Sequence, residues 1–200
     1  MIVVIKYFSA LFFLTYVVVA FVLPSARAYA LSRVNPITFG RSDTVHDYVG
    51  RWFKIILAFI PFAIIVFIID RTWYEYLLPA HFLEEPEVQL TGIVLCLLSL
   101  AWTIIAQWHM GSSWRIGIDE NHTTDLRQNG AFKYSRNPIF LGMLVTLTGF
   151  FFLLPNAITL VVLVVGYLLI QVQVRLEEEF LSKQHGEAYY LYRKEVRRWL

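Results

Sequence analysis

A basic turn that contains a proline reads Gly130-Ala131-Phe132-Lys133-Tyr134-Ser135-Arg136-Asn137-Pro138-Ile139-Phe140-Leu141-Gly142. A second charged cluster reads Arg175-Leu176-Glu177-Glu178-Glu179-Phe180-Leu181. Two apolar stretches lie between the clusters and are joined only by a short turn at Pro155-Asn156. Consecutive helices with so short a connection run antiparallel. The arrangement therefore predicts both clusters at one face of a membrane, within reach of one ligand.

The composition is that of a membrane protein. Of the 200 residues, 58% are hydrophobic and 16% are charged, which is far from the average of soluble domains. A hydrocarbon core about 30 Å thick requires roughly 20 mostly apolar residues per helical span. We therefore predict an all-α membrane protein with about five transmembrane helices, in the apolar stretches Ile2–Leu23, Trp52–Ile69, Val88–Met110, Pro138–Leu154 and Ala157–Val174.

The first stretch also has features of a secretory signal peptide. Lys6 is a weak basic start, and Ala28-Tyr29-Ala30 has the small-residue pattern of a cleavage site. The apolar run is longer than the ~7–15 residues of the usual hydrophobic region of a signal peptide. We therefore expect this stretch to be retained as a membrane span.

The basic residues predict the orientation. Lys and Arg gather after the first stretch, before the fourth and in the tail, whereas the segment between the second and third stretches has Arg71 alone against five acidic residues. An excess of Lys and Arg marks the cytoplasmic side. We expect a multi-pass protein with its N-terminus outside, Lys6 being the one exception, and with both charged clusters at the cytoplasmic face.

Two further segments each allow two interpretations. The polar stretch Ser25–Gly50, with turn signals at Asn35-Pro36 and Phe39-Gly40, either covers the cytoplasmic surface or is an ordinary solvated loop. After a helix break at His185-Gly186, aromatic and apolar residues recur at helical spacing and predict a C-terminal interfacial helix. That helix either anchors the chain at anionic lipid or also walls a ligand pocket with its tyrosines: Tyr189, Tyr192, Val196 and Trp199.

The first cluster predicts a helix start that suits an anion. Asn is favoured as an N-cap and Pro at the first helical position, so a helix should begin at Asn137-Pro138. The positive end of that helix would attract a carboxylate or phosphate, and Arg136 could add a bidentate contact. Alternatively, Arg136 and Lys133 serve only to orient the chain in the membrane.

The second cluster offers carboxylates. Successive glutamates on a helix point about 100° apart, so at most two of Glu177, Glu178 and Glu179 can face one site. The spacing places Arg175 and Glu178 on a common helix face. The alternative is a solvated helix whose charges pair among themselves.

The two clusters together suit a zwitterionic ligand, such as the amino-acid part of S-adenosylmethionine. A metal site is disfavoured because the histidines are scattered without ligand spacing. The glycine motifs of nucleotide-binding folds are absent from the sequence. The basic residues follow the membrane topology and do not cluster as in nucleic-acid-binding proteins, so we expect no nucleic-acid partner. The histidines are His46, His81, His109, His122 and His185.

The C-terminal half resembles the isoprenylcysteine carboxyl methyltransferase and phospholipid methyltransferase superfamily of integral membrane enzymes. The pattern before the family's helical hairpin is matched by Gly130, Phe132, Lys133, Arg136, Pro138, Phe140 and Gly142. The pattern after it is matched by Arg175, Glu177, Glu178, Leu181, Gly186, Tyr189, Tyr192 and Val196. A weaker upstream family segment resembles Gly111–Arg115.

The resemblance implies methyl transfer from S-adenosylmethionine to a lipophilic or lipidated acceptor, for example the carboxylate of a prenylated cysteine. It implies that Arg136 and Arg175 orient the substrate. The cofactor site would comprise Phe132, Tyr134, Asn137, Pro138, Phe140, Glu177, Glu178 and Tyr189. Membrane lipids would be further partners.

The chain departs from the family pattern at Asn137, which replaces the usual histidine. Ala131 replaces a proline, and His185 replaces an aromatic residue. Asn can exchange hydrogen bonds but does not titrate near neutral pH, so a basic role at this position is lost while a positioning role survives.

The expected organisation is one integrated membrane domain. Residues 1–110 would shape the acceptor site, and residues 111–200 would bind the cofactor through the helical hairpin and the C-terminal helix. Two other functions stay open: a non-catalytic scaffold or transport-related protein, and a membrane oxidoreductase similar to sterol reductases.

Overall fold

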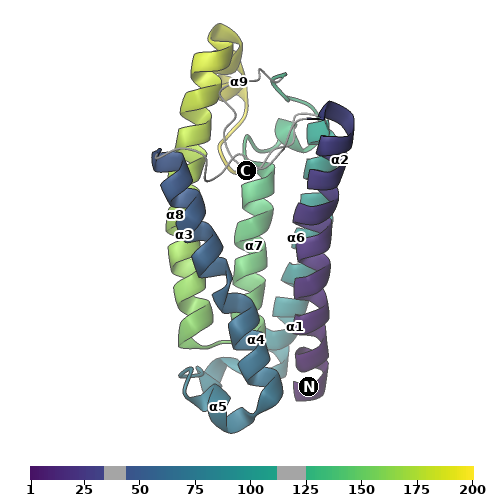
Figure 1. Cartoon of the computed structure of the whole chain (residues 1–200), viewed down its shortest axis with the longest axis vertical. Helices are drawn as coiled ribbons and strands as arrows, with labels where there is room; N and C mark the ends of the chain where they lie inside the picture. Colours follow the sequence, from purple (N-terminus) through teal and green to yellow (C-terminus); the bar gives the residue numbers. More distant parts are fainter. Residues whose placement is uncertain (34–43, 112–124) are drawn as a thin grey trace.

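The computed structural model describes residues 1–33, 44–111 and 125–200. The turn signals at Asn35-Pro36 and Phe39-Gly40 lie outside these residues, as do His122 and the Ser112–Arg115 part of the upstream family segment. The described chain is built from helices, and an isolated bridge joins Pro79 to Asn156. Figure 1 shows the long helices side by side along one axis. The all-α prediction is confirmed.

Four helical stretches among the described residues are long and apolar enough to cross a membrane: Ile2–Ala30, Val45–Ile69, Pro86–Met110 and Ala157–His185. A fifth apolar helix, α7 (Pro138–Leu153), has 16 residues and is therefore about 24 Å long. The chain is thus an integral membrane protein with four to five spans. Because α7 is short, its first turn lies below the ends of its neighbours (Figure 1).

The first helix is longer than predicted. It runs as α1 (Ile2–Val17), the π turn η1 (Val18–Val22) and α2 (Leu23–Ser32). A proline in a regular α-helix lacks one hydrogen bond and crowds the carbonyl four residues earlier. Here the Leu23 N–H donates to the Val18 carbonyl five residues back, and the wider π turn accommodates Pro24. The expectation of a polar loop from Ser25 is therefore wrong, since helix continues to Ser32.

The second helix begins earlier than predicted and is broken in its middle. Thr44 caps α3 (Val45–Leu57) by accepting a hydrogen bond from the Asp47 N–H at 3.3 Å. The helix α4 (Phe59–Ile69) follows after Ala58. The break lies three residues before Pro61. Proline has no backbone N–H, so it cannot donate the hydrogen bond that would continue the helix through this turn.

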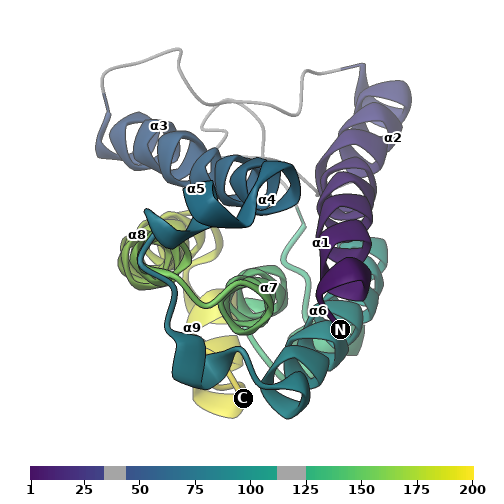
Figure 2. The same ribbon diagram turned by 90° about the horizontal axis from the view of Figure 1, so that it is seen from below.

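Small residues let α7 approach α6 (Pro86–Met110) closely. A Cβ added to Gly149 would lie 3.1 Å from the Gly92 carbonyl oxygen, and one added to Gly92 would lie 2.9 Å from the Leu153 nitrogen. Higher up, the hydroxyls of Ser99 and Thr146 share a hydrogen bond of 2.8 Å. Such close packing is typical of helix pairs in membranes. Figure 2, seen along the helices, shows α7 between α6 and α8.

The hairpin of α7 and α8 (Ala157–His185) forms as predicted. Asn156 caps α8 by accepting a hydrogen bond from the Thr159 N–H at 3.0 Å, and the Thr159 hydroxyl accepts one from the Asn156 N–H at 3.2 Å. The short α5 (Arg71–Glu75) and η2 (His81–Leu83) lie at the same end, where the Ala80 N–H donates to the Pro155 carbonyl at 2.7 Å.

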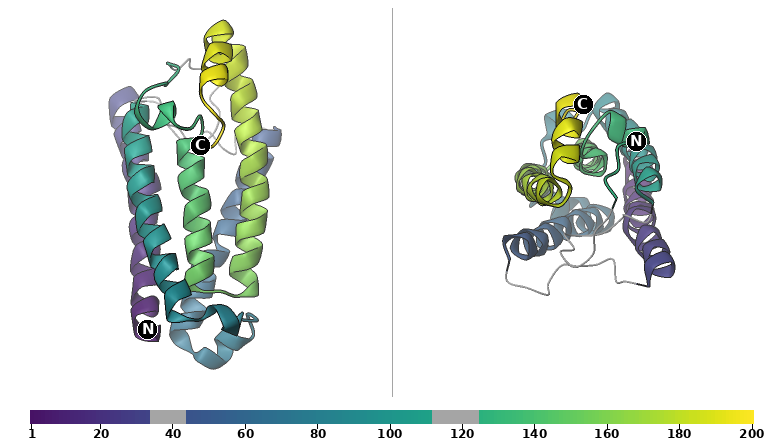
Figure 3. Two further views of the ribbon diagram at one scale, coloured as in Figure 1. Left: turned by 180° about the vertical axis from the view of Figure 1, so that it is seen from behind. Right: turned by 90° about the horizontal axis from the view of Figure 1, so that it is seen from above.

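The opposite end of the bundle holds the charged clusters. The helix α8 continues without interruption through the acidic run and ends at Gly186, whose φ is +52°. This confirms the predicted break. The last helix, α9 (Glu187–Glu195), folds back, and the tail after it lies over the start of α7 (Figure 3).

We expect Gly149→Ala to destabilise the bundle. Its new methyl group would meet Cys96 Sγ at 2.7 Å and the Cys96 backbone nitrogen at 3.1 Å, and overpacking of this kind costs about 1–3 kcal/mol. Thermal unfolding in lipid nanodiscs should show a midpoint several degrees lower. Gly166→Ala is the matched control, because its methyl would meet only the mobile end of Leu147. Equal midpoints for both variants would contradict this packing.

Candidate functional site

The start of α7 carries the first cluster. A 3₁₀ turn, η4 (Gly130–Lys133), leads into Asn137 and Pro138, where α7 begins as predicted. The Asn137 side chain does not cap the helix. Its Nδ2 donates instead to Glu178 Oε1 at 3.1 Å and to the Arg198 carbonyl at 3.3 Å. The amide at this position therefore joins α7 to α8 and to the tail.

The two charged clusters meet at the Glu178 carboxylate. Arg136 donates to its Oε1 from Nε at 3.3 Å and from Nη2 at 3.1 Å. Arg198 donates to Oε1 from Nε at 3.1 Å and to Oε2 from Nη2 at 2.8 Å. The side chains of Arg136 and Glu178 are only 7% and 9% exposed. We call the group of Arg136, Asn137, Glu178 and Arg198 the Glu178 clamp.

The Glu178 clamp holds the tail over the start of α7. Arg136 Nη1 donates to the carbonyls of Val196 at 2.7 Å and Arg193 at 3.2 Å, and the Arg136 N–H donates to the Arg197 carbonyl at 3.0 Å. Hydrogen bonds to Glu178 raise the pKa of Arg198 above its ordinary value, although burial opposes this. Sequence reasoning missed Arg198, which is one of several arginines in a basic tail.

Two of the three tyrosines of α9 face the protein, whereas Tyr190 is 51% exposed. Tyr189 and Tyr192 are 2% and 5% exposed. The Tyr192 hydroxyl donates to the Phe132 carbonyl at 2.7 Å, and burial raises the pKa of Tyr189 to about 12. The helix ends at Glu195, so Val196 and Trp199 do not continue the predicted helical stripe. Tyr189 and Tyr192 are buried, yet neither lines the cavity. Both interpretations of this segment stay predictions.

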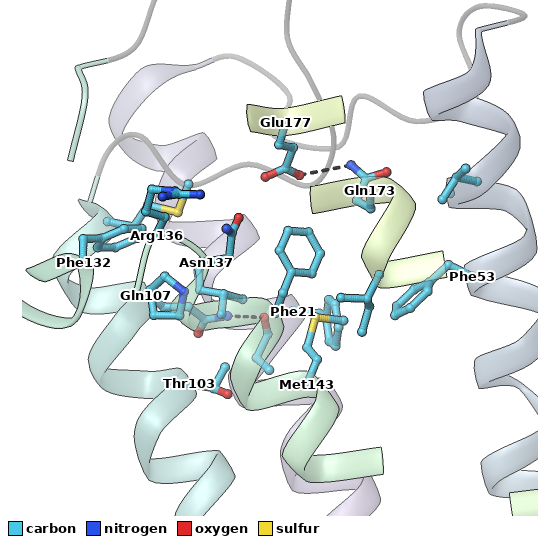
Figure 4. Close-up of a pocket in the computed structure, with 18 of the residues that line it drawn as sticks. Phe21, Phe53, Thr103, Gln107, Phe132, Arg136, Asn137, Met143, Gln173 and Glu177 are labelled. Carbon is cyan, nitrogen blue, oxygen red and sulfur yellow. Dashed lines mark hydrogen bonds between the residues drawn. The ribbon is translucent and has the colours of Figure 1, made fainter. Parts of the chain in front are cut away.

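A cavity of about 150 Å³ lies beside the Glu178 clamp, between η1, α3, α6, α7 and α8 (Figure 4). Six of the residues predicted for the site line it: Phe132, Arg136, Asn137, Pro138, Phe140 and Glu177. The other walls are mainly apolar and include Phe21 and Phe53 from the N-terminal half. The cavity therefore joins a charged mouth to an apolar chamber.

The neighbouring glutamates have different surroundings. Glu177 faces the cavity, where Oε1 accepts a hydrogen bond from Gln173 Nε2 at 3.0 Å. Gln173 Nε2 also lies 2.9 Å from His46 Nδ1. Among the described residues Glu177 has no ion-pair partner, and Gln173 Oε1 is buried without a hydrogen-bond partner. Glu177 is thus the carboxylate that faces the cavity among the described residues, and sequence reasoning had missed Gln173 and His46.

Four predicted residues do not line the cavity: Arg175, Tyr134, Glu178 and Tyr189. Arg175 Nη1 donates to the Gln171 carbonyl at 2.6 Å and to Gln171 Oε1 at 2.9 Å, on the outer side of α8. Arg175 and Glu178 both line an outer groove of about 380 Å³, in agreement with their predicted common face. Tyr134 is 67% exposed and does not line the cavity.

A comparison with protein families identifies the matched part of the chain. The model described as phospholipid methyltransferase matches residues 88–188, half of the 200 residues. The match runs from α6 to the start of α9 and includes most of the charged mouth of the cavity. A search of curated proteins finds no match.

We expect Arg198→Met to release the tail. The variant loses two charge-assisted hydrogen bonds to Glu178, worth about 1.5–3 kcal/mol for a bond to a charged group. Limited proteolysis with a C-terminal tag should remove the tail about ten times faster or more. Arg197→Met is the control, because the Arg197 side chain is exposed and only its carbonyl receives a bond from Arg136. Equal cleavage rates would contradict the Glu178 clamp.

Proposed function

Because the chain belongs to the phospholipid methyltransferase family, we propose that it transfers a methyl group from S-adenosylmethionine to a lipophilic acceptor. The family membership confirms the resemblance seen in the sequence and makes the chain a membrane methyltransferase in general terms. The donor, the acceptor and the residue roles below are the proposal. The observation that carries it is one cavity with a charged mouth and an apolar interior.

The residues at the mouth fit the amino-acid part of S-adenosylmethionine. Its ammonium group needs an acceptor, and Glu177 supplies one. Its carboxylate needs donors. A guanidinium has five N–H groups, and four of those of Arg136 are engaged with Glu178, Arg193 and Val196. One N–H on Nη2 is left for the ligand.

We assign different roles to the two glutamates. Glu177 faces the cavity with a single donor, so it is the better contact for the ammonium group. Glu178 already receives bonds from Arg136, Asn137 and Arg198, so we assign it the role of a positioning residue that aims Arg136. The pattern-based expectation that Glu178 contacts the cofactor directly stays a prediction.

The aromatic residues and the tail complete the proposed donor site. Phe132 and Phe140 offer apolar walls. Tyr189 is buried beside Tyr192 and does not line the cavity. Tyr134 and Arg175 lie outside the cavity, so direct roles for them stay predictions from the family pattern. The tail would limit access of water to the mouth, because it lies over the start of α7.

The proposed chemistry relies on alignment. S-adenosylmethionine supplies a methyl group on a positively charged sulfur. The acceptor atom bonds to this methyl carbon while the carbon–sulfur bond breaks and leaves its electron pair on sulfur. Holding the two reacting groups in line can supply several kcal/mol of the barrier. A carboxylate acceptor needs no base at pH 7, whereas an amine or thiol must lose a proton.

The two halves of the chain divide the site in this proposal. Residues 1–110 contribute Phe21 and Phe53, whereas the charged mouth comes from residues 111–200. The apolar side would hold a lipophilic or lipidated acceptor, such as a prenylated cysteine. The distribution of Lys and Arg supports a mouth at the cytoplasmic face and an N-terminus outside.

We expect the purified protein in nanodiscs to bind S-adenosylmethionine and its demethylated product, measured by calorimetry. Incubation with labelled donor and membrane lipids should then transfer label to a lipophilic product. Nicotinamide dinucleotides serve as the comparison ligand, since an oxidoreductase similar to sterol reductases would prefer them. Absence of donor binding in a protein with a cooperative unfolding transition would overturn the proposal and favour a non-catalytic scaffold.

A set of three variants separates the roles of the charged residues on α8. Glu177→Gln should weaken donor binding about tenfold or more, the cost expected for a lost charge-assisted hydrogen bond, with little change in thermal midpoint. Glu178→Gln should lower the midpoint because it leaves buried arginine charge unpaired. Arg175→Gln, on the outer side of α8, should change neither. If Glu177→Gln binds the donor as tightly as the wild type and a folded Glu178→Gln does not bind it, the ammonium contact would be assigned to Glu178.

A further inference from the structure

A pair of hydrogen bonds links the N-terminal half of the protein to Glu177. Gln173 lies one turn before Glu177 on α8, and its Nε2 donates to Glu177 Oε1 at 3.0 Å. The same Nε2 lies 2.9 Å from Nδ1 of His46, in the first turn of α3. Gln173 is buried, and α3 packs against α8 (Figure 2). The cavity mouth is therefore connected to a helix outside the family match of residues 88–188.

The amide nitrogen of Gln173 fixes the hydrogen-bonding roles of both neighbours. A side-chain amide nitrogen carries two N–H groups and accepts no hydrogen bond. It meets one neighbour with each N–H, so His46 Nδ1 is the acceptor and the neutral imidazole carries its proton on Nε2. The reverse orientation of the amide would place Gln173 Oε1 against the Glu177 carboxylate, where two acceptors repel. The two neighbours together thus hold the amide in one orientation.

This amide in turn fixes the direction of the Glu177 carboxylate. Figure 4 shows one carboxylate oxygen turned toward Gln173, and both side chains line the cavity. The other oxygen, Oε2, accepts no hydrogen bond in the part of the chain that the structure describes, and it is not among the fully buried atoms. A side chain that is already held in place loses less freedom when a ligand binds. The arrangement therefore prepares one accessible carboxylate oxygen for a cation.

We propose that His46 and Gln173 are positioning residues for the donor: His46 orients the Gln173 amide, and the amide holds the Glu177 carboxylate toward the ammonium group of the ligand. The contact between Glu177 and the donor rests on the proposed function, whereas the bonds among the three side chains do not. The inference gives α3 two tasks. It walls the apolar chamber with Phe53, and it supports the charged mouth through His46.

Two replacements of His46 test this role. His46→Leu removes the acceptor, whereas His46→Asn keeps one, because the side-chain carbonyl of Asn can take the place of Nδ1. The affinity for S-adenosylhomocysteine is measured by calorimetry in nanodiscs. We expect His46→Leu to weaken it about fivefold, within the range of couplings in one hydrogen-bond network, and His46→Asn to restore most of it. Tyr48→Phe is the control, because Tyr48 lies on the same helix and is 56% exposed.

Two comparisons separate positioning from a general loss of structure. Methylthioadenosine lacks the amino-acid part of the donor, so its affinity should be equal in the wild type and in His46→Leu. In a Gln173→Leu background, His46→Leu should cause no further loss of affinity for S-adenosylhomocysteine, because His46 acts through that amide. Equal losses for both ligands, or a full additional loss in the Gln173→Leu background, would overturn the positioning role.

Nitrogen NMR of protein with isotope-labelled histidine gives a readout that needs no ligand. The Nδ1 signal of His46, assigned by its absence in His46→Asn, should be that of an unprotonated nitrogen and should move in Gln173→Leu. A protonated Nδ1 or an unmoved signal would overturn the inference whatever the protein binds. Failure of the wild type to bind S-adenosylhomocysteine would instead reject the proposed function and the ligand role of these residues with it. Normal binding that is unchanged in His46→Leu would reject the positioning role alone.

Discussion

The buried carboxylate of Glu178 is the interaction on which the site depends. It joins the end of α8 to Arg136 at the start of α7 and to Arg198 in the tail. Removing one member of a buried ion pair costs several kcal/mol because the remaining charge is left unpaired. The same contacts fix the direction of Arg136, which also lines the cavity. Folding of the tail and formation of the cavity mouth are therefore linked through one carboxylate.

Helix geometry explains why adjacent acidic residues have different surroundings. Neighbours on a helix point about 100° apart, so Glu177 turns into the cavity while Glu178 turns toward the tail. A zwitterion needs both a free acceptor and a free donor. In the proposed site, Glu177 is the acceptor and one N–H of Arg136 is the donor, while Glu178 is satisfied within the fold.

Much of the architecture could be read from local signals. Apolar lengths located the helices, Asn156 and the Asn137-Pro138 pair marked two helix starts, and Gly186 marked a break. The predicted bounds of the first and second helices were wrong because apolar length alone did not locate their ends. The predicted apolar stretch ended at Leu23, but α2 continues through Pro24 to Ser32 because the π turn of η1 accommodates the proline. The residues before Trp52 are partly polar, so apolar length did not indicate that α3 begins at Val45, after the N-cap Thr44.

The sequence by itself determined that two charged clusters end at one face of a helical membrane protein, because apolar length, helix caps and a short turn act between near neighbours. Only the tertiary structure decided which side chains meet there. Arg198 reaches Glu178, Gln173 approaches His46, and Tyr16 lies with Thr103 in one cavity. These pairs are distant in the chain, and their contacts depend on how the helices rotate and pack. That packing is set by many long-range contacts at once, so a local sequence pattern does not predict it.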